Sequence, residues 1–211
     1  MSLLFPRKCV LCRKILSHNE TDLCHECRKT APELNKAKLK ISFVARWTAV
    51  WYYKDTVRSS ILRYKFGNAR SYADVYGRML AMKIQKEDLE FDVLSFVSTG
   101  WLRRIKRGYD HAALLARAVG RELGVGHVKL LKKIRQTKPQ SRLRDAAARR
   151  ANVLGAYKVI DPESVKGKRV LLIDDIITTG ATLSECSRIL LVAGAKEVSC
   201  AAVAAASHDN K

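Results

Sequence analysis

The chain has 211 residues, 47% of them hydrophobic and 7% aromatic, and its 40 lysines and arginines against 20 acidic residues give a formal net charge of +20. This length and composition predict a globular protein with one good core and a small additional module. No stretch approaches the length of a membrane-spanning helix, and residues 1–10 are too short and too charged to form the apolar region of a signal peptide. We therefore expect a cytoplasmic protein.

The first pattern along the chain consists of two C-x-x-C pairs. Its four members are Cys9, Cys12, Cys24 and Cys27. Two such pairs brought together by a hairpin place four thiolates at tetrahedral spacing, which predicts a structural zinc site. A redox C-x-x-C is the alternative, and it is disfavoured because no thioredoxin-like strand precedes the pairs. Cys186 and Cys200 lie in apolar segments, so we expect them to be small core residues.

The segment around these cysteines holds few large apolar side chains. Metal binding would therefore supply much of its folding free energy, on the order of 10 kcal/mol. We predict two domains, a zinc-binding module at residues 1–38 and a larger domain at residues 39–211, with residues 30–40 acting as a short linker.

In the larger domain the hydrophobic pattern alternates between the period of strands and the period of helices. The predicted strands are residues 44–53, 91–97, 128–131, 157–160, 170–174 and 198–204. The predicted helices are residues 56–64, 72–85, 110–123 and 183–193, the third of them N-capped by Asp110. This alternation predicts an α/β fold, a mainly parallel sheet with flanking helices.

Positive charge is concentrated between residues 101 and 150, which carry +12 of the net charge. The residues predicted to contact nucleic acid are Arg103, Arg104, Lys132, Lys133, Arg135, Lys138, Arg142 and Arg144. Such a density predicts a polyanionic partner, most simply nucleic acid, with single-stranded DNA as the first candidate. A solvated face that keeps the protein soluble and an anchor to acidic lipid are the alternatives. Residues 136–150 are predicted to form a mobile basic loop that leads into a short helix.

The most informative segment is Arg169–Leu183, where a short apolar strand leads two acids into a loop rich in Thr and Gly. Ligands of α/β sheets bind beyond the carboxyl ends of parallel strands, and the N-terminus of the following helix favours an anion. Thr178, Thr179 and Thr182 add hydroxyl donors, and Gly180 lets the backbone approach a ligand closely. The loop therefore predicts a phosphate site.

Asp174 and Asp175 would repel an anion placed directly on them, so they must face another group. A sugar diol or a hydrated Mg²⁺ suits two carboxylates, which indicates a ribose 5-phosphate that carries a metal-bound group. This segment has two alternative interpretations. One is a strand end followed by a simple turn, and the other is a receiver-type phosphorylation pocket. A Walker A site is excluded because the chain has no G-x-x-x-x-G-K-[ST].

The two acids and the Thr-Thr-Gly-x-Thr that follows them resemble the phosphoribosyl pyrophosphate (PRPP) motif of type I phosphoribosyltransferases. The resemblance implies that Asp174 and Asp175 hold the ribose hydroxyls at the reacting centre and are the catalytic residues. It also implies that the 5-phosphate is bound by Ile177, Thr178, Thr179, Gly180, Ala181 and Thr182.

Most of the chain resembles the ComF family, phosphoribosyltransferase-like proteins with an N-terminal zinc module that are associated with DNA uptake in bacterial competence. The further motifs that carry this resemblance are Tyr64-Lys65-Phe66-Gly67, residues 107–112, Thr137 with Gln140, and Arg150 with Asn152. The chain departs from similar proteins in two places, where it has Val97-Ser98 instead of Val-Pro and residues 107–111 instead of Arg-Gly-Phe-Asn-Gln.

The resemblance implies that PRPP binds together with Mg²⁺. The pyrophosphate would be gripped by Ser98, Thr99 and Gly100 and neutralised by Arg104 together with Lys106 or Arg107. No general base is identifiable from the sequence. Asp175 is the least poor candidate because it is expected near the sugar, where Asp174 would raise its pKa.

We therefore expect a PRPP-binding protein with a basic DNA-binding face that acts in DNA uptake during natural transformation, together with other DNA-uptake proteins. Two alternatives remain open: a non-catalytic zinc-containing DNA-binding scaffold or PRPP sensor, and a housekeeping phosphoribosyltransferase unrelated to DNA. The fold alone does not choose between them.

Overall fold

A computed structural model of the chain describes residues 6–35, 39–100, 108–138, 143 and 145–207. The helices are α1 (His25–Thr30), α2 (Asp55–Phe66), α3 (Tyr72–Lys86), α5 (His111–Leu123), α6 (Ala146–Val153) and α7 (Ala181–Val192). The strands are β1 (Trp47–Tyr52), β2 (Val93–Phe96), β3 (Leu131–Lys133), β4 (Tyr157–Val159), β5 (Arg169–Ile177) and β6 (Glu197–Ala205).

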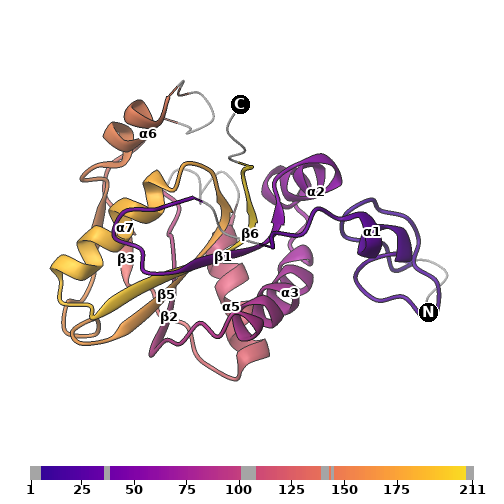
Figure 1. Cartoon of the computed structure of the whole chain (residues 1–211), viewed down its shortest axis with the longest axis horizontal. Helices are drawn as coiled ribbons and strands as arrows, with labels where there is room; N and C mark the ends of the chain where they lie inside the picture. The colour runs from indigo at the N-terminus through magenta and orange to yellow at the C-terminus, as the bar shows by residue number, and fades with distance from the viewer. Residues whose placement is uncertain (1–5, 36–38, 101–107, 139–142, 144, 208–211) are drawn as a thin grey trace.

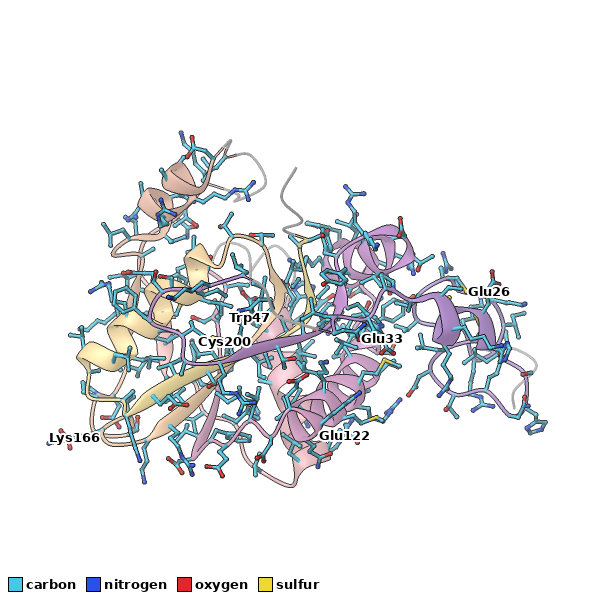
Figure 2. The ribbon with its side chains drawn as sticks, viewed as in Figure 1. Glu26, Glu33, Trp47, Glu122, Lys166 and Cys200 are labelled. Carbon is cyan, nitrogen blue, oxygen red and sulfur yellow. The ribbon has the colours of Figure 1, made fainter. Side chains whose placement is uncertain are left out.

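Four of these strands form one parallel sheet in the order β1-β6-β5-β2. Trp47 of β1 is paired in register with Cys200 of β6, and the two are labelled in neighbouring strands in Figure 2. Strands β3 and β4 form a separate antiparallel pair. The prediction of a mainly parallel α/β sheet is confirmed.

Strand β5 is buried on both faces, as its continuous apolar run predicts. Successive side chains point to opposite sides, so Leu171 and Ile173 join the core under α3 and α5, whereas Val170 and Leu172 join the core under α7. Helices therefore cover both faces of the sheet (Figure 1). Cys186 and Cys200 are fully buried in the α7 core, as predicted.

Helix α5 begins where the sequence predicts. The side chain of Asp110 accepts hydrogen bonds from the backbone N–H groups of Ala112 and Ala113, which caps the first turn. Gly124 ends the helix with a left-handed backbone conformation.

The zinc-binding module lies beside α2 and α3, at one end of the molecule in Figure 1. The segment predicted as a linker is partly paired with the sheet, because the N–H of Tyr52 donates to Pro32 and the N–H of Leu34 donates to Val50. Leu34 is buried there, 3% exposed. Backbone pairing and an apolar anchor thus join this segment to β1. Glu33, which forms an isolated bridge with Trp51, is labelled at this junction in Figure 2.

The observed strands all differ somewhat in extent from the predicted ones, and pairing explains two of the differences. The strand expected at residues 128–131 begins only at Leu131. The residues before Leu131 instead lie beside β2, where His127 forms an isolated parallel bridge with Leu94. The strand expected to end at Asp174 continues to Ile177, since β6 pairs with it along this whole length. Every helix in the described part of the chain is too short or too polar to cross a lipid bilayer.

Candidate functional site

The two acids lie at the C-terminal end of β5, in the middle of the parallel sheet. The chain then turns through Thr178–Gly180, and α7 begins at Ala181. A small, open hollow lies at this turn. It is lined by Asp174, Ile176, Ile177, Thr178, Thr179, Gly180, Ala181, Thr182 and Leu183. The fold thus places one of the predicted acids and the predicted phosphate loop around a single hollow.

Gly180 is required at the point where the loop enters α7. Its φ of 71° lies in the left-handed region, which side chains with a Cβ adopt only with strain. A Cβ added at this position would also lie 2.7 Å from Cγ1 of Ile41, a buried residue of the segment before β1. Backbone conformation and close packing therefore both select glycine here.

The two carboxylates have different partners. Asp174 Oδ1 accepts a hydrogen bond of 2.8 Å from the backbone N–H of Asp175. Asp175 Oδ1 forms an ion pair of 2.8 Å with Nζ of Lys65, at the C-terminal end of α2. The side chains of this pair are only 21% and 15% exposed, so solvent screens their attraction weakly.

Lys65 was not among the predicted site residues. A signal for it existed, because the motif Tyr64-Lys65-Phe66-Gly67 contributes to the family resemblance, but the motif alone gives the lysine no role. The contact joins residues that are far apart in sequence, so only the tertiary structure shows it.

Asp174 has a raised pKa. Burial, the largest cause, and the charge of Asp175 together raise the pKa of Asp174 to about 8 against the opposing charge of Lys65. The prediction that Asp174 raises the pKa of Asp175 stays a prediction. Among the described residues, the Lys65 ammonium contacts Asp175.

The second predicted loop, Ser98–Gly100, follows β2 at the same edge of the sheet. The N–H of Val97 donates to Ile173, so this loop starts beside the strand position just before the acid pair. Ser98 Oγ donates to the carbonyl of Leu131, and the N–H of Thr99 donates to Oδ2 of Asp110. The fold thus holds the loop next to the acid pair. Arg104, Lys106 and Arg107 lie outside the described residues.

Two of the predicted nucleic-acid residues, Lys133 and Arg135, make contacts within the protein. Arg135 donates to the carbonyls of Asn152 and Leu154 at the C-terminal end of α6. Lys133 donates to Thr137 and lies over the ring of Tyr157.

Two other predicted nucleic-acid residues, Lys132 and Lys138, are exposed. Arg103, Arg104, Arg142 and Arg144 lie outside the described residues. The described part of the predicted basic face is therefore β3 and the segment that follows it.

The four cysteines of the N-terminal module converge as predicted, with their sulfur atoms all within 4.8 Å of one another. The sulfurs of Cys12 and Cys24 are 3.6 Å apart. A tetrahedral zinc ion with Zn–S bonds of about 2.3 Å separates its sulfur ligands by about 3.8 Å, so the cluster fits zinc. The module is a four-cysteine zinc ribbon.

Comparison with known families finds two matching regions in the chain. Residues 1–38 match the double zinc ribbon domain, and residues 110–211 match the phosphoribosyl transferase domain.

The chain is also similar over most of its length to several bacterial proteins. Competence protein F of Haemophilus influenzae is 26% identical over 92% of this chain and 95% of its own length. Competence protein ComFC of Streptococcus pneumoniae is 26% identical over 90% of this chain and 96% of its own length. The DNA utilization protein YhgH of Escherichia coli O157:H7 is 25% identical over 93% of this chain and 96% of its own length. With its zinc ribbon and its phosphoribosyltransferase-type domain, the chain is thus similar over most of its length to competence and DNA utilization proteins.

Proposed function

We propose that this protein binds PRPP together with Mg²⁺ and holds DNA on a basic face during DNA uptake. One observation carries the PRPP assignment: an acid pair and a Thr/Gly loop lie in succession between the central β5 and the N-terminus of α7, with Ser98–Gly100 alongside.

Each part of the site suits one part of PRPP. The N-terminal turn of α7 offers backbone N–H groups and the positive end of the helix dipole to the 5-phosphate. Asp174, which lines the hollow, and its neighbour Asp175 would accept hydrogen bonds from the ribose hydroxyls. The close approach of backbone to ligand depends on Gly180.

Ser98–Gly100 would face the pyrophosphate, and Arg104, Lys106 and Arg107 of the segment that follows would add positive charge. Mg²⁺ bound with the pyrophosphate would supply further charge neutralisation, and the oxygen-rich lining of the hollow suits a cation that prefers oxygen ligands. In a transferase reaction an acceptor would attack the anomeric carbon of the ribose as the pyrophosphate leaves. Asp175, held by Lys65, would face the ribose throughout.

The DNA part of the proposal rests on charge and on the relatives. Residues 101–150 carry +12, more than one pyrophosphate requires. The relatives are named as competence and DNA utilization proteins. We place the protein in the cytoplasm, where single-stranded DNA is its first candidate partner and other DNA-uptake proteins dock on the zinc ribbon.

A non-catalytic scaffold or PRPP sensor is the second candidate. It is favoured by the absence, among residues the structure describes around the hollow, of any side chain besides the two acids that is suited to general-base catalysis. An enzyme releases pyrophosphate when it is given an acceptor, whereas a scaffold shows salt-dependent DNA affinity without turnover.

Calorimetric titration of the zinc-loaded protein with PRPP tests the proposal. The titration is run with and without Mg²⁺, and with and without a single-stranded oligonucleotide. We expect PRPP to bind only when Mg²⁺ is present. If no condition gives binding, the Thr/Gly loop has no PRPP function, and a zinc-containing DNA-binding scaffold becomes the better description.

A further inference from the structure

Helix α2 touches the backbone of the zinc ribbon at the turn between its first two cysteines. Val10 and Leu11 form this turn between Cys9 and Cys12, and both are buried. Arg63 donates to the carbonyls of both residues, and Ser60 donates to the carbonyl of Val10. The carbonyls of this turn are oriented by the cysteine ligands on either side of it, so α2 contacts a part of the backbone whose shape depends on the metal.

The same helix carries the lysine that pairs with Asp175. Lys65 follows Arg63 by two positions, which on an α-helix turns the two side chains about 200° apart. Arg63 therefore faces the zinc ribbon while Lys65 faces the end of β5. One short helix thus touches both the metal-binding turn and the acid pair.

Between these two contacts α2 is fixed to the body of the protein. Tyr64 is fully buried, its hydroxyl donates 2.7 Å to the carbonyl of His111, and Nε2 of His111 lies 2.9 Å from the carbonyl of Tyr64. These reciprocal contacts tie the C-terminal turn of α2 to the start of α5.

We infer that Lys65 is a positioning residue for the acid pair, and that the zinc-loaded ribbon, through Arg63 and Ser60, holds it in place. The inference rests on the proposed function, because it assigns the acid pair to PRPP. It gives the zinc ribbon a role at the PRPP site in addition to any role in docking partners.

The geometry indicates that Lys65 orients Asp175 for the ligand and does not block the site. Lys65 contacts Oδ1 of Asp175, which leaves Oδ2 of the same carboxylate available to a ribose hydroxyl. The ammonium of Lys65 contacts Asp175 directly and so fixes the orientation of this carboxylate before the ligand arrives. Removal of the lysine leaves a weakly exposed carboxylate without its cation and free to rotate.

The first test measures the affinity for PRPP with Mg²⁺ by calorimetry. We expect Lys65→Met to weaken binding by about 10-fold to 100-fold, the range seen when a residue that orients a ligand-binding group is removed. Lys65→Arg should restore most of the affinity, and Arg63→Met should weaken it by a smaller factor. Arg58→Met is the matched control, because it removes the same charge from an exposed position on the same helix. Tighter binding by Lys65→Met would show that the lysine blocks the site and would overturn the inference.

The second test needs no PRPP. Hydrogen exchange of peptides from residues 174–182 is measured by mass spectrometry before and after a chelator removes zinc. We expect removal to accelerate exchange there by about tenfold in the wild type, while residues 189–192 at the far end of α7 stay unchanged. In Lys65→Met the exchange should be fast from the start and should respond little to the chelator.

The two tests separate the inference from the proposed function. If the wild type does not bind PRPP but exchange at residues 174–182 still depends on zinc and on Lys65, the PRPP assignment fails while the coupling stands. If PRPP binds, and neither its affinity nor the exchange changes in Lys65→Met or on zinc removal, the inference is wrong and the PRPP assignment stands.

Discussion

Ile41 packs directly against Gly180, so the segment that leads from the zinc ribbon into β1 also covers the loop that enters α7. The contact leaves no room for a Cβ at position 180, where the backbone is also left-handed.

We therefore predict that Gly180→Ala destabilises the protein by about 2–3 kcal/mol, since strain at a positive φ and overpacking add. Chemical denaturation measures this loss. Gly155→Ala is the control, because Gly155 has a similar φ of 66° and open space around it. It should cost about 1 kcal/mol, from strain alone. Equal losses of unfolding free energy at the two glycines would contradict the packing argument. In the Ile41→Ala background, Gly180→Ala should cost less unfolding free energy than in the wild type.

A second prediction concerns pH and the protein free of ligand. The folded-state pKa of Asp174, about 8, lies above the ordinary carboxyl value of about 4, so the folded state binds the extra proton. Stability contributed by this group is present below pH 4 and is lost as the pH rises toward 8. Asp174→Asn should thus raise the free energy of unfolding at pH 8 by at least about 1 kcal/mol and leave it unchanged at pH 4.

Asp92→Asn provides a control of opposite sign. Hydrogen bonds from Arg169 lower the pKa of Asp92 to about 2, so its contribution is present above pH 4 and is lost as the pH falls toward 2. Asp92→Asn should therefore destabilise the protein at pH 8. A stability profile in which Asp174→Asn also destabilises at pH 8 would show that the carboxyl is not held protonated.

Zinc content gives a third prediction. Cys24→Ser should lose the metal and lower the melting temperature, because four thiolates are needed to close the site. Cys186→Ser is the matched control, since this cysteine is buried in the α7 core, away from the cluster. It should keep a full equivalent of zinc by elemental analysis. Retention of zinc by Cys24→Ser would remove this residue from the ligand set.

The fourth prediction concerns DNA. Affinity for a single-stranded oligonucleotide should fall steeply with salt, and Lys132→Gln with Lys138→Gln should reduce the slope of log affinity against log salt by about 0.7 per lost phosphate contact. Lys166→Gln with Lys196→Gln removes the same charge outside residues 101–150 and should leave the slope unchanged. Equal effects from the two pairs would mean that net charge, not a defined face, governs binding.

Local patterns were sufficient to predict the fold and the zinc ribbon. The apolar run before Asp174 and the Thr/Gly loop after it are contiguous in sequence, so strand, loop and helix could be placed together. The same holds for the cysteine pairs, whose spacing alone indicates a metal site.

Contacts between distant segments could not be predicted. The pairing of Lys65 with Asp175, the packing of Ile41 on Gly180 and the pairing of residues 32–34 with β1 join parts of the chain with no local pattern in common. Nor does a count of charges show that Arg135 binds the carbonyls at the end of α6.

Removal of the acid pair tests most directly that Asp174 and Asp175 hold the ribose of PRPP. PRPP with Mg²⁺ is titrated into the wild type, Asp174→Asn, Asp175→Asn and the double variant, each checked for a cooperative thermal transition. We predict binding by the wild type, at least about tenfold weaker binding by each single variant, and none by the double variant. If the folded double variant binds PRPP as tightly as the wild type, the acids do not hold the ribose and the assignment of this site is wrong.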